Sequence, residues 1–461
     1  MKKTYVVSAL LCLGILSAKA QFTDMFDFNG PLNGTTSRGA LLLSGSTLYG
    51  MTQYGAGNSA GDIFSIGTNG SGFADMHDFA AATGQHPQGT LILSGTTLYG
   101  MTFDGGANSD GCIFSIQTNG SGYTDLFDFN GTNGKNPAGA LTISGSTLYG
   151  MTSYGGANNN GCLFSIQTNG TGYTDMHDFA FGNPTGSLTL SGSTLYGMVF
   201  GGGANFDGFI FTIQTNGSSF TDIYDFTGTP GKYPDGSLIL SGTTLYGTTE
   251  GGGANNDGVV FSVQTSGSGY TDLLDFNGTN GSHPNSDLVL SGSTLYGTTY
   301  YGGTSDYGCI FSVQTNGSGY VKMQDFVGPN GKYSQGSLIL SGTTLYGLTT
   351  GGGANSNGIV YSITTNTVAT GVTEITDANS NINVYPNPST GVFTVNSEKL
   401  KENSVVEVYN TLGEKIANSK WLSANNQIQI DLSGQPNGIY LYRALDADGA
   451  LLGQGKLIVK K

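Results

Sequence analysis

Short apolar runs alternate with turn segments rich in glycine, asparagine and serine along most of the chain. In one stretch the apolar runs cover residues 238–240, 244–248, 259–263 and 270–276. β-Branched and aromatic residues fill these runs, and Ser-Gly-Thr or Ser-Gly-Ser-Gly segments separate them, which is the pattern of β-hairpins. We therefore predict four strands per unit, called a, b, c and d in chain order.

This unit recurs seven times. The triplet Leu-Tyr-Gly recurs every 50 residues, with one shorter step of 47, and ends at Gly50, Gly100, Gly150, Gly197, Gly247, Gly297 and Gly347. A single four-stranded sheet buries too little apolar surface to offset about 1–2 kcal/mol of backbone entropy per ordered residue. The units must therefore pack against one another.

The two ends of the repeat region favour a closed ring. Residues 22–28 match a lone d strand, and residues 359–363 match a lone c strand with no d strand after it. Propellers of four to eight four-stranded blades leave no apolar face exposed at an end. We predict an all-β fold with a seven-bladed β-propeller over residues 21–366, in which the N-terminal strand completes the last blade.

Different sequence flanks the repeats. Residues 1–20 combine Lys2 and Lys3, an apolar run and an Ala-Lys-Ala end, which predicts a signal peptide. Residues 367–381 are predicted as a linker, and residues 382–461 as a small Ig-like β-sandwich with strands near 405–409, 427–432, 439–444 and 456–459. After the signal peptide, no run is apolar enough to predict a membrane span.

The repeats resemble a known family. Their Leu-Tyr-Gly-x-Thr, Gly-Gly-x-x-x-x-Gly and Phe-Ser-x-x-Thr-Asn-Gly-Ser-Gly-Tyr segments resemble the GloVer tandem repeat of secreted bacterial proteins over residues 22–366. The strand layout is also similar to kelch-type propellers, with Tyr or Phe in place of the kelch Trp. The resemblance implies a propeller but no defined activity.

The C-terminal domain carries a set of ordered motifs. Their residues are Tyr385, Pro386, Asn387, Pro388, Gly391, Gly413, Gly438, Tyr440 and Lys456. On these residues the domain resembles the type A sorting domain of the type IX secretion system of Bacteroidota. The resemblance covers residues 382–461 and implies export across both membranes, to the cell surface or the extracellular space, with the tail recognised by the secretion machinery and commonly removed. An ordinary Ig-like module is the alternative.

Charge disfavours nucleic acids and anionic membranes as partners, and the cysteine pattern argues against disulfide bonds. Residues 21–371 hold 5 basic and 22 acidic residues, a net charge of −17, which disfavours nucleic acids and anionic membranes. Cys112, Cys162 and Cys309 occupy one repeat position that is apolar in most other copies. We expect them to be small buried residues, because their odd number and equivalent positions argue against a disulfide network.

No catalytic or metal-binding constellation emerges, and we expect no cofactor. His77 and His177 are copies of one strand position and are predicted to be structural. The Asp-x-x-Asp pairs, such as Asp125 and Asp128, are expected on opposite faces of a strand, with the second Asp in a turn or edge hydrogen bond. Loops such as 255–258 carry at most one carboxylate each, so we interpret them as turns and not as calcium sites.

Sequence variation concentrates on one rim, formed by the b–c and d–a connections. Tyr, His and Asn on a rigid scaffold suit flat polar ligands such as sugars, and we predict a rim that binds a glycan or surface polymer. Surface loops without a function explain the same variation equally well. The predicted ligand-binding residues are Tyr54, His86, Phe103, Asn136, Tyr154, Tyr233, Glu250, His283, Tyr300 and Tyr333.

Three classes of function follow. The leading interpretation is a non-enzymatic binding or adhesion propeller. The alternatives are a polysaccharide hydrolase or lyase on the same scaffold and a passive structural surface protein. An enzyme needs unique polar residues near the axis, and the predicted a strands at 41–43, 91–93 and 238–240 carry none. Arg38, Asp104 and Glu250 could reach inward from loops.

Overall fold

The computed structural model describes residues 21–365, 382–397, 400–401, 404–410, 415–420, 427–446 and 451–461. The predicted signal peptide and linker lie outside these residues. The chain divides into two compact units, residues 1–366 and 367–461. Each unit is described by itself.

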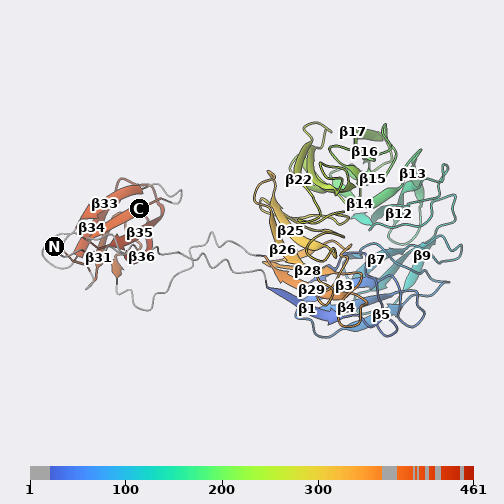
Figure 1. Cartoon of the computed structure of the whole chain (residues 1–461), viewed down its shortest axis with the longest axis horizontal. Coiled ribbons are helices and arrows are strands. Elements are labelled where there is room, and N and C mark those ends of the chain that lie inside the picture. Colours follow the sequence, from blue (N-terminus) through green and yellow to red (C-terminus); the bar gives the residue numbers. More distant parts are fainter. Residues whose placement is uncertain are drawn as a thin grey trace, which may run out of the picture. The chain divides into compact units, whose positions relative to one another are not determined.

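Residues 21–365 form seven antiparallel sheets arranged around a common centre (Figure 1). Six sheets use strands from one repeat. Their strands are β2 (Leu42–Ser44), β3 (Thr47–Thr52), β4 (Asp62–Gly67) and β5 (Ala74–Asp78); β6 (Ile92–Ser94), β7 (Thr97–Thr102), β8 (Cys112–Gln117) and β9 (Thr124–Asp128); β10 (Thr142–Ser144), β11 (Thr147–Met151), β12 (Cys162–Gln167) and β13 (Thr174–Asp178); β14 (Pro184–Ser191), β15 (Thr194–Val199), β16 (Phe209–Gln214) and β17 (Thr221–Asp225); β18 (Lys232–Pro234), β19 (Ile239–Ser241), β20 (Thr244–Gly251), β21 (Val259–Gln264) and β22 (Thr271–Asp275); and β23 (Val289–Ser291), β24 (Thr294–Thr298), β25 (Cys309–Gln314) and β26 (Val321–Asp325).

The seventh sheet joins the two ends of the repeat region and is called the closing sheet. It contains β27 (Ile339–Ser341), β28 (Thr344–Leu348), β29 (Ile359–Thr364) and, at its outer edge, β1 (Phe22–Asp27). β1 pairs antiparallel with β29, and Figure 1 shows the blue first strand beside the orange last strand. The predicted ring closure by the N-terminal strand is therefore confirmed.

Apolar side chains fill the space between neighbouring sheets. Seven such clusters occur in residues 21–365, and each draws its buried residues from two sheets that are adjacent in the ring. In one of them Phe28, Leu41 and Phe64 pack with Tyr346 and Val360, which joins the first repeat to the closing sheet. The core thus continues around the whole ring, as in a propeller.

The Leu-Tyr-Gly motif has a packing explanation. A Cβ atom on Gly50 would lie 2.4 Å from the ring of Phe64, which belongs to the paired strand β4. The same approach occurs in the other six sheets, for example 2.4 Å between Gly347 and Tyr361. Glycine in strand b therefore makes room for the buried aromatic ring of strand c.

The C-terminal unit is a β-sandwich. One sheet contains β30 (Asn383–Tyr385), β31 (Val392–Asn396) and β34 (Gln427–Asp431); the other contains β33 (Lys415–Lys420), β32 (Val405–Tyr409), β35 (Gly438–Leu445) and β36 (Leu451–Val459). Buried Phe393 and Ile430 of the first sheet share a core with Val408 and Leu457 of the second. The all-β prediction is confirmed, and the Ig-like assignment stays a prediction.

Candidate ligand-binding site

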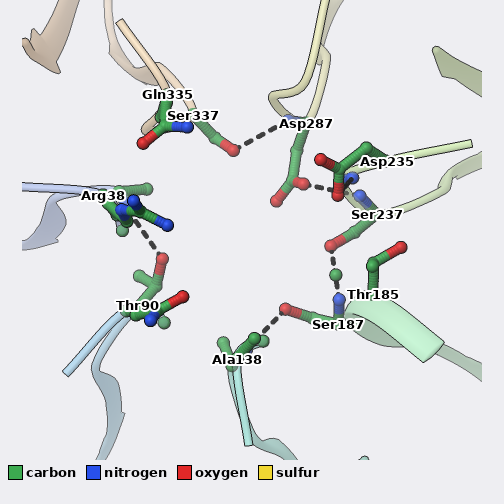
Figure 2. Close-up of a pocket in the computed structure, with 18 of the residues that line it drawn as sticks. Arg38, Thr90, Ala138, Thr185, Ser187, Asp235, Ser237, Asp287, Gln335 and Ser337 are labelled. Atoms are coloured by element: carbon green, nitrogen blue, oxygen red, sulfur yellow. Dashed lines mark hydrogen bonds between the residues drawn. The ribbon is translucent and has the colours of Figure 1, made fainter. Parts of the chain in front are cut away.

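A cavity of about 230 Å³ lies where the seven sheets of the propeller meet (Figure 2). Residues from three successive positions at the inner end of the repeats form its wall, with two positions contributing in the last two repeats. The first position holds Arg38, Gln88, Ala138, Thr185, Asp235, Asn285 and Gln335, and the third holds Ala40, Thr90, Ala140, Ser187, Ser237, Asp287 and Ser337. Every repeat therefore contributes to this central channel.

Glycine at the middle position lets neighbouring repeats approach closely. A Cβ atom on Gly139 would lie 1.7 Å from the carbonyl oxygen of Gly186, so no larger residue fits there. This approach permits hydrogen bonds from a backbone N–H in one repeat to a side chain in the next. Five links of this kind run from Ala40 to Thr90 (2.8 Å), Ala140 to Ser187 (2.9 Å), Ser187 to Ser237 (2.8 Å), Ser237 to Asp287 (2.6 Å) and Asp287 to Ser337 (2.8 Å).

Two carboxylates stand close together in this wall. Burial raises the pKa of Asp235 to about 7, and the charges of Glu250 and Asp287 add to the rise, while the Gly236 N–H and the Arg38 charge oppose it. Burial also raises the pKa of Asp287, against hydrogen bonds from Ser237 and Ser337. Arg38 lies across the cavity from both carboxylates (Figure 2). The channel therefore has an acidic side and a basic side.

The predicted rim position in the d–a loops has an unusual backbone. Thr36, His86, Asn136, Tyr233, His283 and Tyr333 all have φ between 52° and 59°. Non-glycine residues rarely adopt this left-handed conformation, and it costs on the order of 1–3 kcal/mol each. Hydrogen bonds to the preceding repeat hold it, such as the Tyr333 N–H to the Tyr307 carbonyl at 2.9 Å.

The structure brings several predicted rim residues into pairs that join neighbouring repeats. Ring centroids are 4.8 Å apart for Tyr54 and His86 and 5.0 Å apart for Phe200 and Tyr233. The largest group, called the tyrosine cluster, joins Tyr300, Tyr301, Tyr307 and Tyr333 through ring contacts between 4.6 and 5.6 Å. His283 contacts Tyr301 at its edge, and the Lys332 ammonium lies over the rings of Tyr307 and Tyr333.

One ring of the tyrosine cluster, that of Tyr300, lies near enough to the channel residue Arg38 to respond to its charge. Burial raises the pKa of Tyr300. Tyr301 remains 37% exposed, so a ligand can reach its ring.

The other predicted rim residues lie apart from this cluster. Asp104 accepts a hydrogen bond from the Asn136 amide at 2.9 Å and lies 3.1 Å from His86 Nδ1, so two rim residues pair through it. Phe103 is half-buried and its carbonyl also accepts from Asn136. Tyr154 is exposed and stands outside the ring contacts described above. Their role as ligand-binding residues stays a prediction.

The channel residues Asp235, Asn285 and Asp287 were not predicted from the sequence. The predicted a strands at 41–43, 91–93 and 238–240 carry no polar group at the axis, whereas the wall is formed mainly by the residues just before these strands. The signal was present: charged and amide residues flank a position that is glycine in six repeats and Ser286 in the sixth repeat.

One prediction about the Asp-x-x-Asp pairs is wrong. A β-bulge shifts the register between β8 and β9, so that Asp125 opposes Phe114 while Phe127 opposes Ile113. The bulge places side chains i and i+3 on the same face, and Asp125 and Asp128 repel each other enough to raise the Asp125 pKa, already raised by burial, to about 6.

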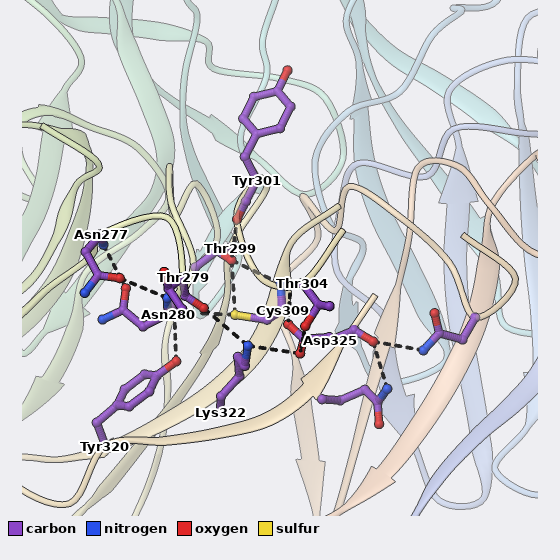
Figure 3. A network of polar contacts seen from close by, with 12 residues as sticks. Asn277, Thr279, Asn280, Thr299, Tyr301, Thr304, Cys309, Tyr320, Lys322 and Asp325 are labelled. Carbon is purple, nitrogen blue, oxygen red and sulfur yellow. Dashed lines mark hydrogen bonds and ion pairs between the residues drawn. The ribbon is translucent and has the colours of Figure 1, made fainter. Parts of the chain in front are cut away.

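The sixth repeat confirms that the two positions converge. There Lys322 replaces the first Asp, and its ammonium lies 3.0 Å from Asp325 Oδ2 and donates to the Thr279 carbonyl at 3.2 Å (Figure 3). The expected hydrogen bond of the second Asp is present in all seven repeats. In each sheet the second Asp accepts a hydrogen bond from a backbone N–H of the Gly-rich loop between strands b and c of that same sheet; the acceptors are Asp27, Asp78, Asp128, Asp178, Asp225, Asp275 and Asp325.

The structural interpretations of histidine and cysteine are confirmed, and the loops contain the expected turn hydrogen bonds. His77 stacks on Tyr123 at 3.8 Å and His177 on Phe220 at 3.6 Å. Cys112, Cys162 and Cys309 are buried free thiols. Loop asparagines act as turn residues, as shown by the Asn255 amide, which donates to the Phe276 carbonyl at 2.9 Å. Within the described ranges no group of three or more His, Cys, Asp or Glu side chains is arranged to hold a metal.

Several predicted sorting residues meet in the C-terminal unit. Asn387 donates to the Lys456 carbonyl at 2.7 Å and accepts from the Ile458 N–H at 2.9 Å. Gly391 has φ of 135°, and a Cβ there would lie 2.5 Å from Ser433. The predicted turn around Gly413 lies outside the described residues.

Comparisons with known families cover nearly the whole chain. The Gloeobacter/Verrucomicrobia repeat matches residues 14–205, 82–246 and 183–396. The secretion system C-terminal sorting domain matches residues 383–460. No curated protein matches the sequence.

Solved structures with a similar fold include enzymes of different classes. An oligogalacturonate lyase in complex with manganese has a TM-score of 0.45 at 11% identity, covering 75% of this chain and 93% of its own. A putative 6-phosphogluconolactonase from Bacteroides uniformis has a TM-score of 0.45 at 14% identity, covering 67% and 88%. A puromycin-hydrolyzing peptidase from Mycobacterium tuberculosis has a TM-score of 0.47 at 10% identity, covering 80% and 61%. At this distance the likenesses carry no argument about function.

Proposed function

Because the chain belongs to the Gloeobacter/Verrucomicrobia repeat family and ends in a secretion system C-terminal sorting domain, we propose that it is an exported, non-enzymatic propeller that binds a glycan or surface polymer at its channel mouth. The sorting domain is of the type IX class and marks proteins carried to the cell surface or the extracellular space. No helix among the described residues is long and apolar enough to cross a membrane.

The proposal includes the processing of the chain. A signal peptide over residues 1–20 directs the first membrane crossing, as in a Bacteroidota source. Residues 21–366 are the functional propeller, residues 367–381 the linker and residues 382–461 the tail that the secretion machinery recognises. Binding or adhesion is then the role of the exported propeller.

The observation that carries the binding proposal is the tyrosine cluster, in which Tyr300 lies near the channel residue Arg38. Partly exposed rings held by neighbouring repeats offer apolar faces for a sugar ring, and channel side chains offer hydrogen bonds to its hydroxyl groups. The strained backbone at Tyr333 is a further sign, since such strain persists mainly where function or tight packing requires it.

A glycan array with the mature chain tests this function. We expect selective binding, and about tenfold weaker binding after Tyr333→Ala or Tyr300→Ala, because each change removes a ring from the cluster. Phe206→Ala is the matched control, since this ring is 66% exposed and lies outside the cluster. Absence of binding to every glycan, or equal affinity of all variants, would contradict the proposal.

A polysaccharide hydrolase or lyase is the second candidate, favoured by the pair Asp235 and Asp287. Two neighbouring carboxylates in different environments are the usual equipment for acid–base cleavage of a glycosidic bond. With its pKa raised to about 7, Asp235 holds a proton over part of the neutral range. Release of shorter products from a bound polysaccharide, lost in Asp235→Asn, would favour this candidate over pure binding.

A further inference from the structure

One side of the channel offers hydrogen-bond acceptors. Asp235 and Asn285 occupy the same wall position in neighbouring repeats, and Asp287 follows two residues after Asn285. We call these three residues the acceptor wall. Asn285 Oδ1 is buried and lacks a hydrogen-bond partner among the described residues. A buried acceptor without a partner costs about 1–3 kcal/mol, which a bound donor group would recover.

The charges of the wall and of the whole propeller favour a cation. The charge of Asp287 raises the cost of ionising Asp235, and a cation beside the two carboxylates would lower that cost. Residues 21–371 as a whole carry a net charge of −17, which attracts cationic ligands at long range.

The size of the channel limits the ligand group. Its volume of about 230 Å³ is smaller than the roughly 300–1,000 Å³ of pockets for drug-sized molecules, so one ring or one small group enters. Arg38 faces the wall from the other side of the cavity and supplies donors for neutral or anionic oxygens (Figure 2). The two sides together therefore orient a ligand unit that carries both an amine and oxygen acceptors.

We propose that the acceptor wall binds the ammonium group of an amino sugar, so that the ligand is a glycan with free amines. This inference rests on the proposed glycan-binding function and specifies its ligand class. The ammonium donates to Asp235, Asn285 and Asp287, while Arg38 donates to hydroxyl or ring oxygens of the same unit. Neighbouring sugar units then lie on the tyrosine cluster.

Calorimetry with the mature full chain tests the inference, using a tetramer of β-1,4-linked glucosamine and the N-acetylated tetramer of the same length. We expect the free amine form to bind at least tenfold more tightly, because acetylation removes the charge and the donors. Asp235→Asn should remove most of this preference while keeping an oxygen acceptor for the Gly236 N–H. Thermal unfolding of the variant checks that the ring stays folded.

Asp222→Asn on β17 is the matched control, because it makes the same substitution at an exposed carboxylate outside the channel. The inference is overturned if both tetramers bind equally, or if the two variants lose the same affinity. Binding of neutral glycans that depends on Tyr333, without a preference for amines, would overturn this inference alone. Absence of any glycan binding would overturn the proposed function as well.

Discussion

Asp62 is a buried carboxylic acid at a repeat position where other sheets carry Cys, Phe, Val or Ile. Its side chain is bonded to the Thr52 hydroxyl, while Oδ2 has no partner among the described residues. Burial raises its pKa to about 8, helped by Asp75 and Asp78 and opposed by Thr52. The equivalent Cys112 makes a 3.2 Å contact with Thr102 without a charge to bury.

Asp62→Cys should stabilise the propeller by about 1–3 kcal/mol near pH 8, because it removes a buried group with an unmet hydrogen bond. The unfolded chain releases the Asp62 proton near pH 4, whereas the folded chain keeps it to about pH 8, so wild-type stability falls over this interval. Thermal unfolding from pH 4 to 9 should show a flatter profile for the variant. Val259→Cys, at a position that is already apolar, should gain nothing; an equal gain there would contradict the explanation.

Strand d, the outermost strand of each sheet, is the element whose side-chain faces differ from the sequence prediction. Period-2 alternation places i and i+3 on opposite faces, and no residue type marks the bulge that reverses this. In β22 the bulge brings Asp272 next to Asp275, and burial together with that neighbour raises the Asp272 pKa to about 6. In β26 the same geometry gives the Lys322–Asp325 ion pair.

Asp272→Lys should therefore raise the Tm at pH 7.5 by about 1–3 °C, because it copies the arrangement of the sixth repeat and replaces repulsion by attraction. The unfolded chain ionises Asp272 near pH 4 and the folded chain only near pH 6, so the wild-type protein loses folding stability as the pH rises through this interval. The gain in Tm from Asp272→Lys should therefore be smaller at pH 4. Lys322→Asp should lower the Tm under the same conditions. An identical effect of Thr271→Lys, one residue away on β22, would show that only net charge matters.

At the scale of the whole molecule the ring depends on one pairing of distant segments. Thr23 on β1 lies opposite Ser362 on β29, and these residues are about 340 positions apart. Ser115 and Thr124 form the equivalent pair inside the second repeat. The two pairs share their geometry and differ mainly in the length of chain between them.

A disulfide between Thr23→Cys and Ser362→Cys should raise the Tm more than one between Ser115→Cys and Thr124→Cys. Cross-links that close long loops remove more entropy from the unfolded chain, by about 4.7 kcal/mol for 100 residues against about 3 for 15. The native thiols are buried and do not compete. Calorimetry with and without reductant measures both gains in Tm. Equal gains would contradict the explanation by loop length.

The sequence predicts the strands and the ring because both depend on local patterns. Alternating residues and Gly turns mark each hairpin, and the lone strands at 22–28 and 359–363 mark the closure. The channel wall could not be predicted in the same way. Asp235, Asn285 and Asp287 lie about 50 residues or two residues apart in the chain, and only the assembled ring makes them neighbours around a cavity.

The position of β1 has a consequence for the order in which the propeller is synthesised and folds. This strand is made first, yet the edge of β29 that it completes is made about 330 residues later. Until then both edges present free backbone groups, and a second copy of the chain offers the same edge with the same side chains. Two crowded copies can therefore exchange their first strands and form an intertwined dimer with every native bond retained, so dilution during folding favours the single ring.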